Sequence, residues 1–266
     1  LCEEGGHVMQ RPFAWRLVSR IAHAQGRYAV ARLAGERAYA AVQEAQDRWF
    51  ESFVLLDLGK VLLAQGDAQG ARRCFRASHA GWEAFGDPEG RALSLLWEAQ
   101  AALSEGDLHE ARELFAGSLE IYRTRGHRSG LAESAHGLGR VAAALGDDDE
   151  AAGHFCEALA LAHELQFVPL ILATLVSVSE LLLARGRPDL AREPLLLALR
   201  HPSTDHQTGD RAQHLLIAHE HVLGLAGDVA LARVATQAEL DEAVARLLQC
   251  GALAASALPL CELCPA

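Results

Sequence analysis

Apolar residues recur at helical spacing along most of the chain, and short polar segments with glycine interrupt them. Leu93 lies three positions before Leu96 and four before Trp97, which places the three side chains near one face of an α-helix. The most apolar segment, residues 168–184, approaches the length of a membrane span, but two serines and Glu180 interrupt it. We therefore expect an all-α chain in which residues 168–184 form an inner helix.

Glycines mark the predicted turn between the two helices of each pair. They recur every 40 residues, with a last step of 41, at Gly26, Gly66, Gly106, Gly146, Gly186 and Gly227. Aspartate follows four of them, at Asp67, Asp107, Asp147 and Asp228. A glycine can take the left-handed conformation that ends a helix, and the aspartate can accept from free N–H groups of the next helix. Helix A of each unit therefore runs up to the glycine, and helix B runs away from it.

Further positions keep the same register. Five residues after each turn glycine stands alanine, at Ala31, Ala71, Ala111, Ala151, Ala191 and Ala232. Nine residues after it, a large apolar side chain follows on the same helical face, at Phe75, Phe115, Phe155 and Leu195. Seven residues before it, the side chain is small in five units, at Ser19, Gly59, Ala99, Gly139 and Ser179. We expect helices A and B to approach closely at these small residues, and a second turn signal, Gly86-Asp87-Pro88 and Gly126-His127, to end helix B.

Blocks such as Gly66-Asp67, Ala71 and Phe75 resemble the tetratricopeptide repeat consensus, and the resemblance covers roughly residues 12 to 250. It implies a right-handed superhelical solenoid of about six antiparallel helix pairs within residues 1–250, followed by a carboxyl-terminal tail at 251–266. The implied units are residues 12–51, 52–91, 92–131, 132–171, 172–212 and 213–250.

The repeat departs from the usual tetratricopeptide pattern in two ways. Its period is 40 residues, which is longer than usual, and the proline that commonly ends helix B is missing. The sequence is therefore similar to the long-repeat type of bacterial signal-transducing ATPases and LuxR-type regulators. HEAT repeats have a similar period, but they do not explain the Gly-Asp, Ala and Phe series.

Composition narrows the function classes. The chain has 24 basic and 35 acidic residues and a formal net charge of -11, which argues against direct contact with nucleic acid. Its 6 cysteines are scattered through a chain too long to need disulfide staples, so we expect a cytoplasmic protein. The first residues have neither an initiator methionine nor the pattern of a signal peptide, and we expect a piece of a longer protein without a membrane segment.

The resemblance implies that the A helices line a concave groove, so their columns are candidate binding positions. Six residues before the turn glycine the column reads Arg20, Lys60, Gln100, Arg140, Glu180 and His221; ten before, it reads Arg16, Leu56, Leu96, His136, Val176 and Ile217. The two positions are four apart and share one helical face. We expect an extended peptide or a helix that carries carboxylates to bind at Arg16, Arg20, Lys60, Gln100, His136, Arg140 and Glu180. Alternatively, these cations are solvated or pair with neighbours such as Glu133.

Other chemistry is weakly indicated. His214 and His221 share a helix face at a spacing wider than the one-turn pair of metal sites, and the lone pair Cys261 and Cys264 lacks the second pair of a zinc site. We find no nucleophile elbow, phosphate loop or dinucleotide fingerprint, and we predict no catalytic residue, cofactor or metal site. Trp82 and Trp97 fit a core or a pocket. Asp57 and Glu98 fall within apolar helices, where an arginine would have to satisfy them or a ligand would bind.

Three functions stay open at this point. The leading one is a non-catalytic protein-binding, peptide-binding or ligand-sensing module, which the resemblance implies is the carboxyl-terminal sensor region of a larger signalling ATPase or transcriptional regulator. The second is a helical-repeat enzyme or small-molecule binder whose pocket is closed by the tail. The third is a scaffold that self-associates through a terminal helix. The sequence does not determine the oligomeric state or the identity of the partner.

Overall fold

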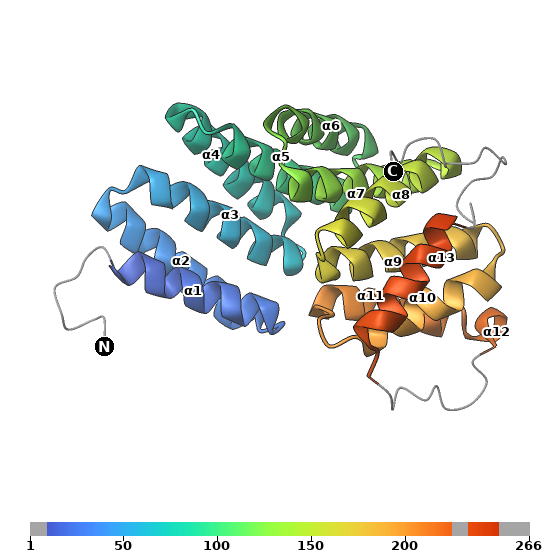
Figure 1. Ribbon diagram of the computed structural model, residues 1–266. Coiled ribbons are helices and arrows are strands. Elements are labelled where there is room, and N and C mark those ends of the chain that lie inside the picture. Colours follow the sequence, from blue (N-terminus) through green and yellow to red (C-terminus); the bar gives the residue numbers. More distant parts are fainter. Residues whose placement is uncertain (1–9, 225–233, 250–266) are drawn as a thin grey trace. The chain divides into compact units, whose positions relative to one another are not determined.

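The computed structural model describes residues 10–224 and 234–249. All regular secondary structure in these parts is helical (Figure 1). The helices are α1 (Gln10–Ala24), α2 (Tyr28–Ala45), α3 (Arg48–Ala64), α4 (Ala68–Phe85), α5 (Pro88–Glu105), α6 (Leu108–Arg125), α7 (Arg128–Leu145), α8 (Asp148–Glu164), α9 (Val168–Ala184), α10 (Pro188–Arg200), α11 (His206–Ala218), α12 (Glu220–Leu223) and α13 (Gln237–Gln249). The predicted fold class, an all-α array of consecutive helix pairs, is confirmed.

The chain divides into two compact units, each of which contains several repeats: the first unit is residues 1–130 and the second unit is residues 131–266. In the first unit α1 to α6 form three helix pairs, and α1 also contacts α3, as α3 contacts α5. We call α1, α3 and α5 the A layer of the first unit. In the second unit α7, α9 and α11 hold the same places in the repeat, and α9 contacts α8, α10 and α11.

The turns use the predicted chemistry. Gly66, Gly106 and Gly146 take φ values of +83°, +81° and +81°, which favour glycine over residues with a Cβ atom. The aspartate after each glycine caps the next helix, because Oδ1 of Asp67, Asp107 and Asp147 accepts from the backbone N–H three residues later, at 2.8, 3.2 and 3.3 Å.

The second turn takes the left-handed conformation in the first four repeats, with and without glycine, whereas His201 after α10 is extended. Gly86 and Gly126 take φ of +67° as C-caps. Gln46 and Gln166 stand 40 residues before Gly86 and 40 after Gly126, and they take φ of 52° and 53°. A non-glycine residue in this region costs about 1–2 kcal/mol, so the repeat geometry overrides the preference of these two glutamines.

The small residues of helix A lie directly against the large residues of helix B. A Cβ atom added at Gly59 would lie 2.5 Å from the ring of Phe75, and one at Gly139 would lie 2.6 Å from the ring of Phe155. The rings of Phe75, Phe115 and Phe155 and the side chain of Leu195 are buried. The close approach of helices A and B that the sequence predicts is therefore present.

The apolar segment 168–184 forms α9, whose side chains belong to the main core cluster of the second unit. It is thus an inner helix, as predicted. Among the helices that the structure describes, none combines the length and the apolar composition that a membrane-spanning segment requires.

The last repeat is irregular. α11 and α12 occupy the place of the sixth A helix, which ends at Gly224 with a φ of +65°, three residues before the predicted turn glycine. α13 contacts α8 and α10. The predicted turn residues Gly227 and Asp228, the small residue Ala232 and the tail at 251–266 lie outside the described residues.

Candidate functional site

In the first unit, the cations of α1 meet a carboxylate of α3. Nε of Arg16 lies 2.7 Å from Oδ2 of Asp57, and Nε of Arg20 lies 3.9 Å from the same oxygen. The Arg16 guanidinium also lies over the rings of Phe50 and Phe53, at 5.5 and 5.0 Å from their centroids. Arg16 is therefore held by an ion pair and by aromatic faces, whereas the Arg20 side chain is 61% exposed.

Lys60 lies three residues after Asp57 on α3 and points toward α5. Its Nζ atom is 4.4 Å from the centroid of the Trp97 ring, within the range of a cation–π interaction. Trp97 also contacts Phe75, with ring centroids 6.3 Å apart, so one face of the indole supports the core and the ring also orients the lysine. Gln100 lies three residues further along α5.

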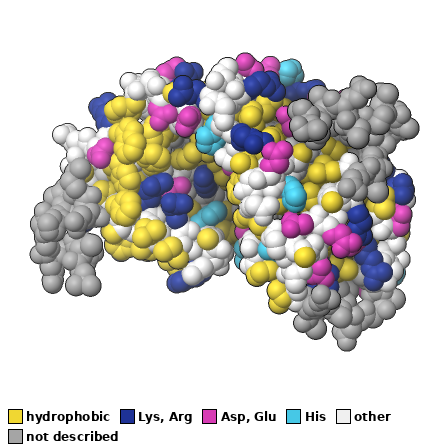
Figure 2. Space-filling view, viewed as in Figure 1, with side chains coloured by type: hydrophobic (Ala, Val, Ile, Leu, Met, Phe, Trp, Pro, Cys, Tyr) yellow, Lys and Arg dark blue, Asp and Glu magenta, His cyan; other side chains and the backbone are white. Residues whose placement is uncertain are grey.

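The A layer of the first unit thus combines cations with apolar side chains. In Figure 2 the face over α1 and α3 carries Lys and Arg side chains among hydrophobic ones. Phe13 and Phe50 stack with centroids 6.2 Å apart, and Phe53 packs edge-on against Trp82 at 4.5 Å. Such a surface can orient a carboxylate and bury an apolar side chain next to it.

In the second unit, a polar cluster links α7, α9 and α11. His136 is buried, and its Nε2 atom is 3.0 Å from Oγ of Ser177. The same oxygen accepts from Nη1 of Arg211 at 3.0 Å and donates to the Ala173 carbonyl at 3.2 Å. When the hydroxyl proton goes to the Ala173 carbonyl, the matching tautomer of His136 donates through Nε2–H. The hydroxyl is engaged on all sides, which suits a structural link better than a nucleophile.

Charge is concentrated in this cluster. Nη2 of Arg211 binds Oε2 of Glu180, which is exposed. Burial lowers the pKa of Arg140 to about 10, with Arg211 adding repulsion and Glu180 opposing it. Burial, followed by Arg140 and Arg211, also holds the pKa of His136 well below its ordinary value. The cluster therefore places the guanidiniums of Arg140 and Arg211 and the carboxylate of Glu180 beside a neutral histidine.

The structure brings the predicted site residues together within each unit. Arg16 and Arg20 meet at Asp57 in the first unit, and His136, Arg140 and Glu180 surround one cluster in the second. Asp57, Trp97, Ser177 and Arg211 complete these contacts and were not predicted as site residues. Asp57, Trp97 and Ser177 each stand nine residues before a turn glycine, so this column carried the missing signal.

The remaining candidates have structural roles. Glu98 is buried and pairs with Nε of Arg76, and Asp57 forms the ion pair with Arg16, so each carboxylate has an arginine as its partner. Trp82 is a core residue whose indole N–H donates to Ser78. His214 and His221 are exposed, and no group of three potential ligands suited to a metal ion occurs in the described parts of the chain. Cys261 and Cys264 lie outside those parts.

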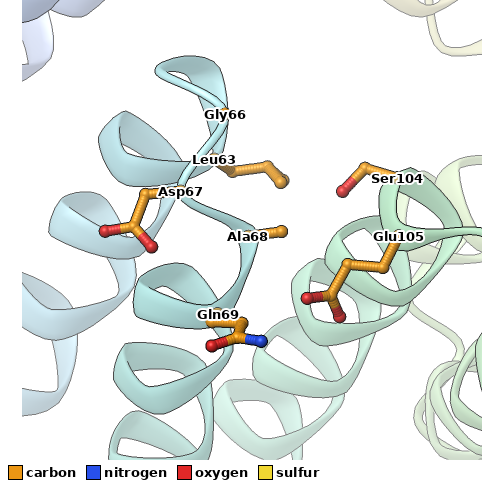
Figure 3. Close-up of a pocket in the computed structure, with 7 residues that line it drawn as sticks. All are labelled: Leu63, Gly66, Asp67, Ala68, Gln69, Ser104 and Glu105. Carbon is orange, nitrogen blue, oxygen red and sulfur yellow. The ribbon is translucent and has the colours of Figure 1, made fainter.

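A cleft of about 360 Å³ lies where the turn after α3 faces the end of α5 (Figure 3). Ser104, Glu105 and Gln69 line it, and the Asp67 carboxylate points away to cap its own helix. Ser104 donates to the Ala101 carbonyl, and Glu105 pairs with Arg72. Because Asp67, Ser104 and Glu105 are engaged in the fold, we regard the cleft as a gap between neighbouring turns.

Comparison with known proteins agrees with the repeat geometry. The family model for the tetratricopeptide repeat matches residues 90–164, which cover α5 to α8. This segment consists of tetratricopeptide repeats. The α3/α4 pair has the same glycine turn, aspartate cap and contact between a small and a large residue, whereas α1/α2 has Arg27 in place of the aspartate and Gly35 in place of the phenylalanine.

A solved structure extends the likeness in fold beyond that segment. It is the crystal structure of a single-residue variant of a Podosopora anserina protein assigned as a kinesin light chain with nearly identical TPR-like repeats. It matches with a TM-score of 0.55 and 19% identity, over 82% of this chain and 99% of that chain. At this identity the match establishes the tetratricopeptide-like fold alone. No curated protein sequence matches the chain significantly.

Proposed function

We propose that the chain is a non-catalytic module that binds an acidic peptide or protein segment on its A helices. The fold is typical of protein-interaction modules, and the binding residues we propose are those that the repeat columns predict: Arg16, Arg20, Lys60, Gln100, His136, Arg140 and Glu180. The single observation that carries the proposal is the combination of ordered cations and aromatic rings on the A layer of the first unit.

Charge in the first unit favours an anionic partner. Together α1 and α3 carry five Lys or Arg residues and two acidic residues, Glu51 and Asp57, and Nε of Arg16 lies 2.7 Å from Oδ2 of Asp57. The whole chain has a formal charge of -11, so this excess of positive charge is local. A carboxylate beside Arg20 and Lys60 would form charge-assisted hydrogen bonds, and exposed Phe13 would contact an adjacent apolar side chain.

The cluster of the second unit supports the same proposal. Arg140 and Arg211 both lie in this cluster, and burial strengthens any electrostatic interaction that a bound carboxylate makes with them. We treat the two surfaces as separate candidate sites, each of which can be tested by its own substitution.

We also propose a cellular context. The free thiols of Cys74 and Cys156 are consistent with a reducing cytoplasm, and the 40-residue period supports a sensor region within a larger signalling ATPase or transcriptional regulator. The reading frame of the gene tests this directly. An encoded ATPase or DNA-binding domain in the same polypeptide would support the context, and a gene that encodes the repeats alone would contradict it.

The binding proposal can be tested with peptides selected on the intact chain. A displayed random-peptide library is panned at low ionic strength, and the affinity of each selected peptide is measured by fluorescence anisotropy. We expect enrichment of Asp and Glu beside an aromatic or aliphatic residue. Lys60→Glu or Arg140→Gln should weaken binding about 10-fold or more, because a hydrogen bond to a charged group contributes about 1.5–3 kcal/mol.

Matched control variants reverse charge on the exposed B-helix positions Arg73 (α4) and Arg192 (α10). Arg73→Glu and Arg192→Glu should leave the affinity within about 2-fold, because exposed charges away from the ligand interact weakly through water. Equal losses in the site and control variants would mean that only net charge matters. A melting temperature that falls with the affinity would assign Lys60 or Arg140 to the fold and overturn their role in binding.

A further inference from the structure

The outer face of α1 exposes apolar residues whose equivalents in other A helices are buried. Eight and five residues before the turn glycine, α3 has Leu58 and Val61, which are 8% and 1% exposed. The equivalent residues of α9, Val178 and Leu181, are 0% and 3% exposed. In α1 the same positions hold Val18 and Ile21, and these are 41% and 50% exposed.

The cover over α3 comes from the preceding helix pair. Val61 packs against Ala22 of α1 and Ala31 of α2, and Val54 packs against Ala38 and Val42. The Cδ1 atom of Leu58 would lie only 3.0 Å from a Cβ atom on Gly35, so Leu58 fits where α2 has no side chain. We call Ala31, Gly35, Ala38 and Val42 the α2 seam.

The uncovered face of α1 is larger than these two residues. Leu17, which is next to Val18 on α1, is 47% exposed, and Val30 and Leu33 of α2 are also exposed. Hydrophobic side chains are visible over α1 in Figure 2. A run of large apolar residues at helical spacing is typical of an interface, whereas single exposed apolar residues are common.

The repeat itself indicates what fits this face. We propose that the outer face of α1 packs against a further helix pair of the same repeat type, which stands before α1 in the polypeptide and presents a seam of small residues like that of α2. The proposed pair would pack against α1 in the same way as the first helix pair packs against α3. Val18 and Ile21 would then make the contacts that Leu58 and Val61 make in α3.

A second copy of the chain is the weaker candidate. An array that continued head to tail would need a B helix whose own seam is uncovered. In α2, α4, α6, α8 and α10 the first seam residue, five positions after the turn glycine, is 0% exposed: Ala31, Ala71, Ala111, Ala151 and Ala191. These five B helices therefore offer no vacant position at this point of the seam to the α1 face of another copy.

The proposal is tested by placing a cysteine at the centre of the face. Ile21→Cys is introduced both into the 266-residue chain and into the protein as its own gene encodes it. Alkylation of this thiol is followed by peptide mapping, and Arg73→Cys on exposed α4 is the control. We expect Cys at position 21 to react as fast as the control in the 266-residue chain and at least about 10-fold more slowly in the gene-encoded protein, because packed apolar interfaces exclude reagent.

The partner is identified by cross-linking from the same position. A photoreactive maleimide on the cysteine should join α1 to a helix that lies about 40 residues before α2 and has small residues at the seam spacing. Equal reactivity in both proteins would overturn the proposal. Protection of the 266-residue chain that rises with its concentration, or a cross-link between two copies, would overturn it in favour of self-association.

A stability measurement gives an independent result. Val18→Glu should change the melting temperature of the 266-residue chain by less than about 2 °C, because the residue is exposed there. The same substitution should lower that of the gene-encoded protein by about 5 °C or more, because a charge would enter a packed interface. Equal shifts in the two proteins would contradict the proposed covering helix pair.

Discussion

Replacement of Gly139 by alanine should destabilise the α7/α8 pair through a steric contact. A Cβ atom at this position would lie 2.6 Å from two ring atoms of Phe155 and 3.2 Å from a third. The Phe155 side chain is 1% exposed, so neighbouring core residues restrict its movement. Overpacking of a well-packed core typically costs about 1–3 kcal/mol.

A matched glycine in the same helix pair separates this contact from helix propensity. Gly153 is exposed in α8, and a Cβ atom there would meet nothing within 4 Å. Alanine gains about 1 kcal/mol over glycine in a helix interior, and both variants receive this gain. Gly139→Ala should therefore be about 1–3 kcal/mol less stable than Gly153→Ala, and the difference measures the contact with Phe155.

Urea unfolding followed by far-UV circular dichroism measures the free energies. A double variant, Gly139→Ser with Phe155→Leu, reproduces the natural pair Ser179 and Leu195 of α9 and α10 and should recover much of the loss through positive coupling. If Gly139→Ala were as stable as Gly153→Ala, or if the double variant showed no coupling, the proposed close approach of helices A and B would be refuted.

Three further predictions concern other parts of the repeat. Gln46→Gly should raise the melting temperature measured by calorimetry, with a gain of about 0.5–1 kcal/mol from relief of the left-handed backbone; an unchanged value would show that Gln46 is not strained. Because burial and the neighbouring arginines hold the pKa of His136 below 6.5, the unfolded state binds the proton first as the pH falls. Stability should therefore decrease below about pH 6.5, by up to about 1.4 kcal/mol per pH unit, until the pKa of the folded state is reached. His136→Gln should flatten this dependence in chemical denaturation between about pH 7 and 5, and an identical slope would contradict the buried neutral histidine. Phe75→Ala should cost about 3–5 kcal/mol by urea unfolding, and a loss below about 1 kcal/mol would place the ring outside the core.

The fold could be predicted because each repeat places the same kinds of residue at the same positions. Gly66 needs a left-handed φ, Asp67 caps the next helix, and Gly59 leaves room for Phe75. Each of these structural requirements involves residues of the same repeat, so their spacing in the sequence is enough to predict it. The last unit was less predictable, because its A helix is interrupted at His219 and ends at Gly224.

The candidate site was only partly predictable from the sequence. The columns identify Arg16 and Lys60 as residues of the A helices, but their contacts with Asp57 and Trp97 reach across to a neighbouring repeat. Such contacts depend on how two helices cross, which spacing within one repeat does not specify. Arg211 reaches Ser177 from α11, in the irregular last repeat, so no column identifies it.

The central claim, that partners bind to the A helices, is tested most directly by hydrogen–deuterium exchange of the intact chain with and without a selected acidic peptide. We predict that the peptide slows exchange in α1, α3 and α5, or in α7, α9 and α11, and leaves α4 and α6 unchanged, because backbone amides under a bound ligand open less often. Slowed exchange confined to the B helices, with the A helices unchanged, would contradict the account.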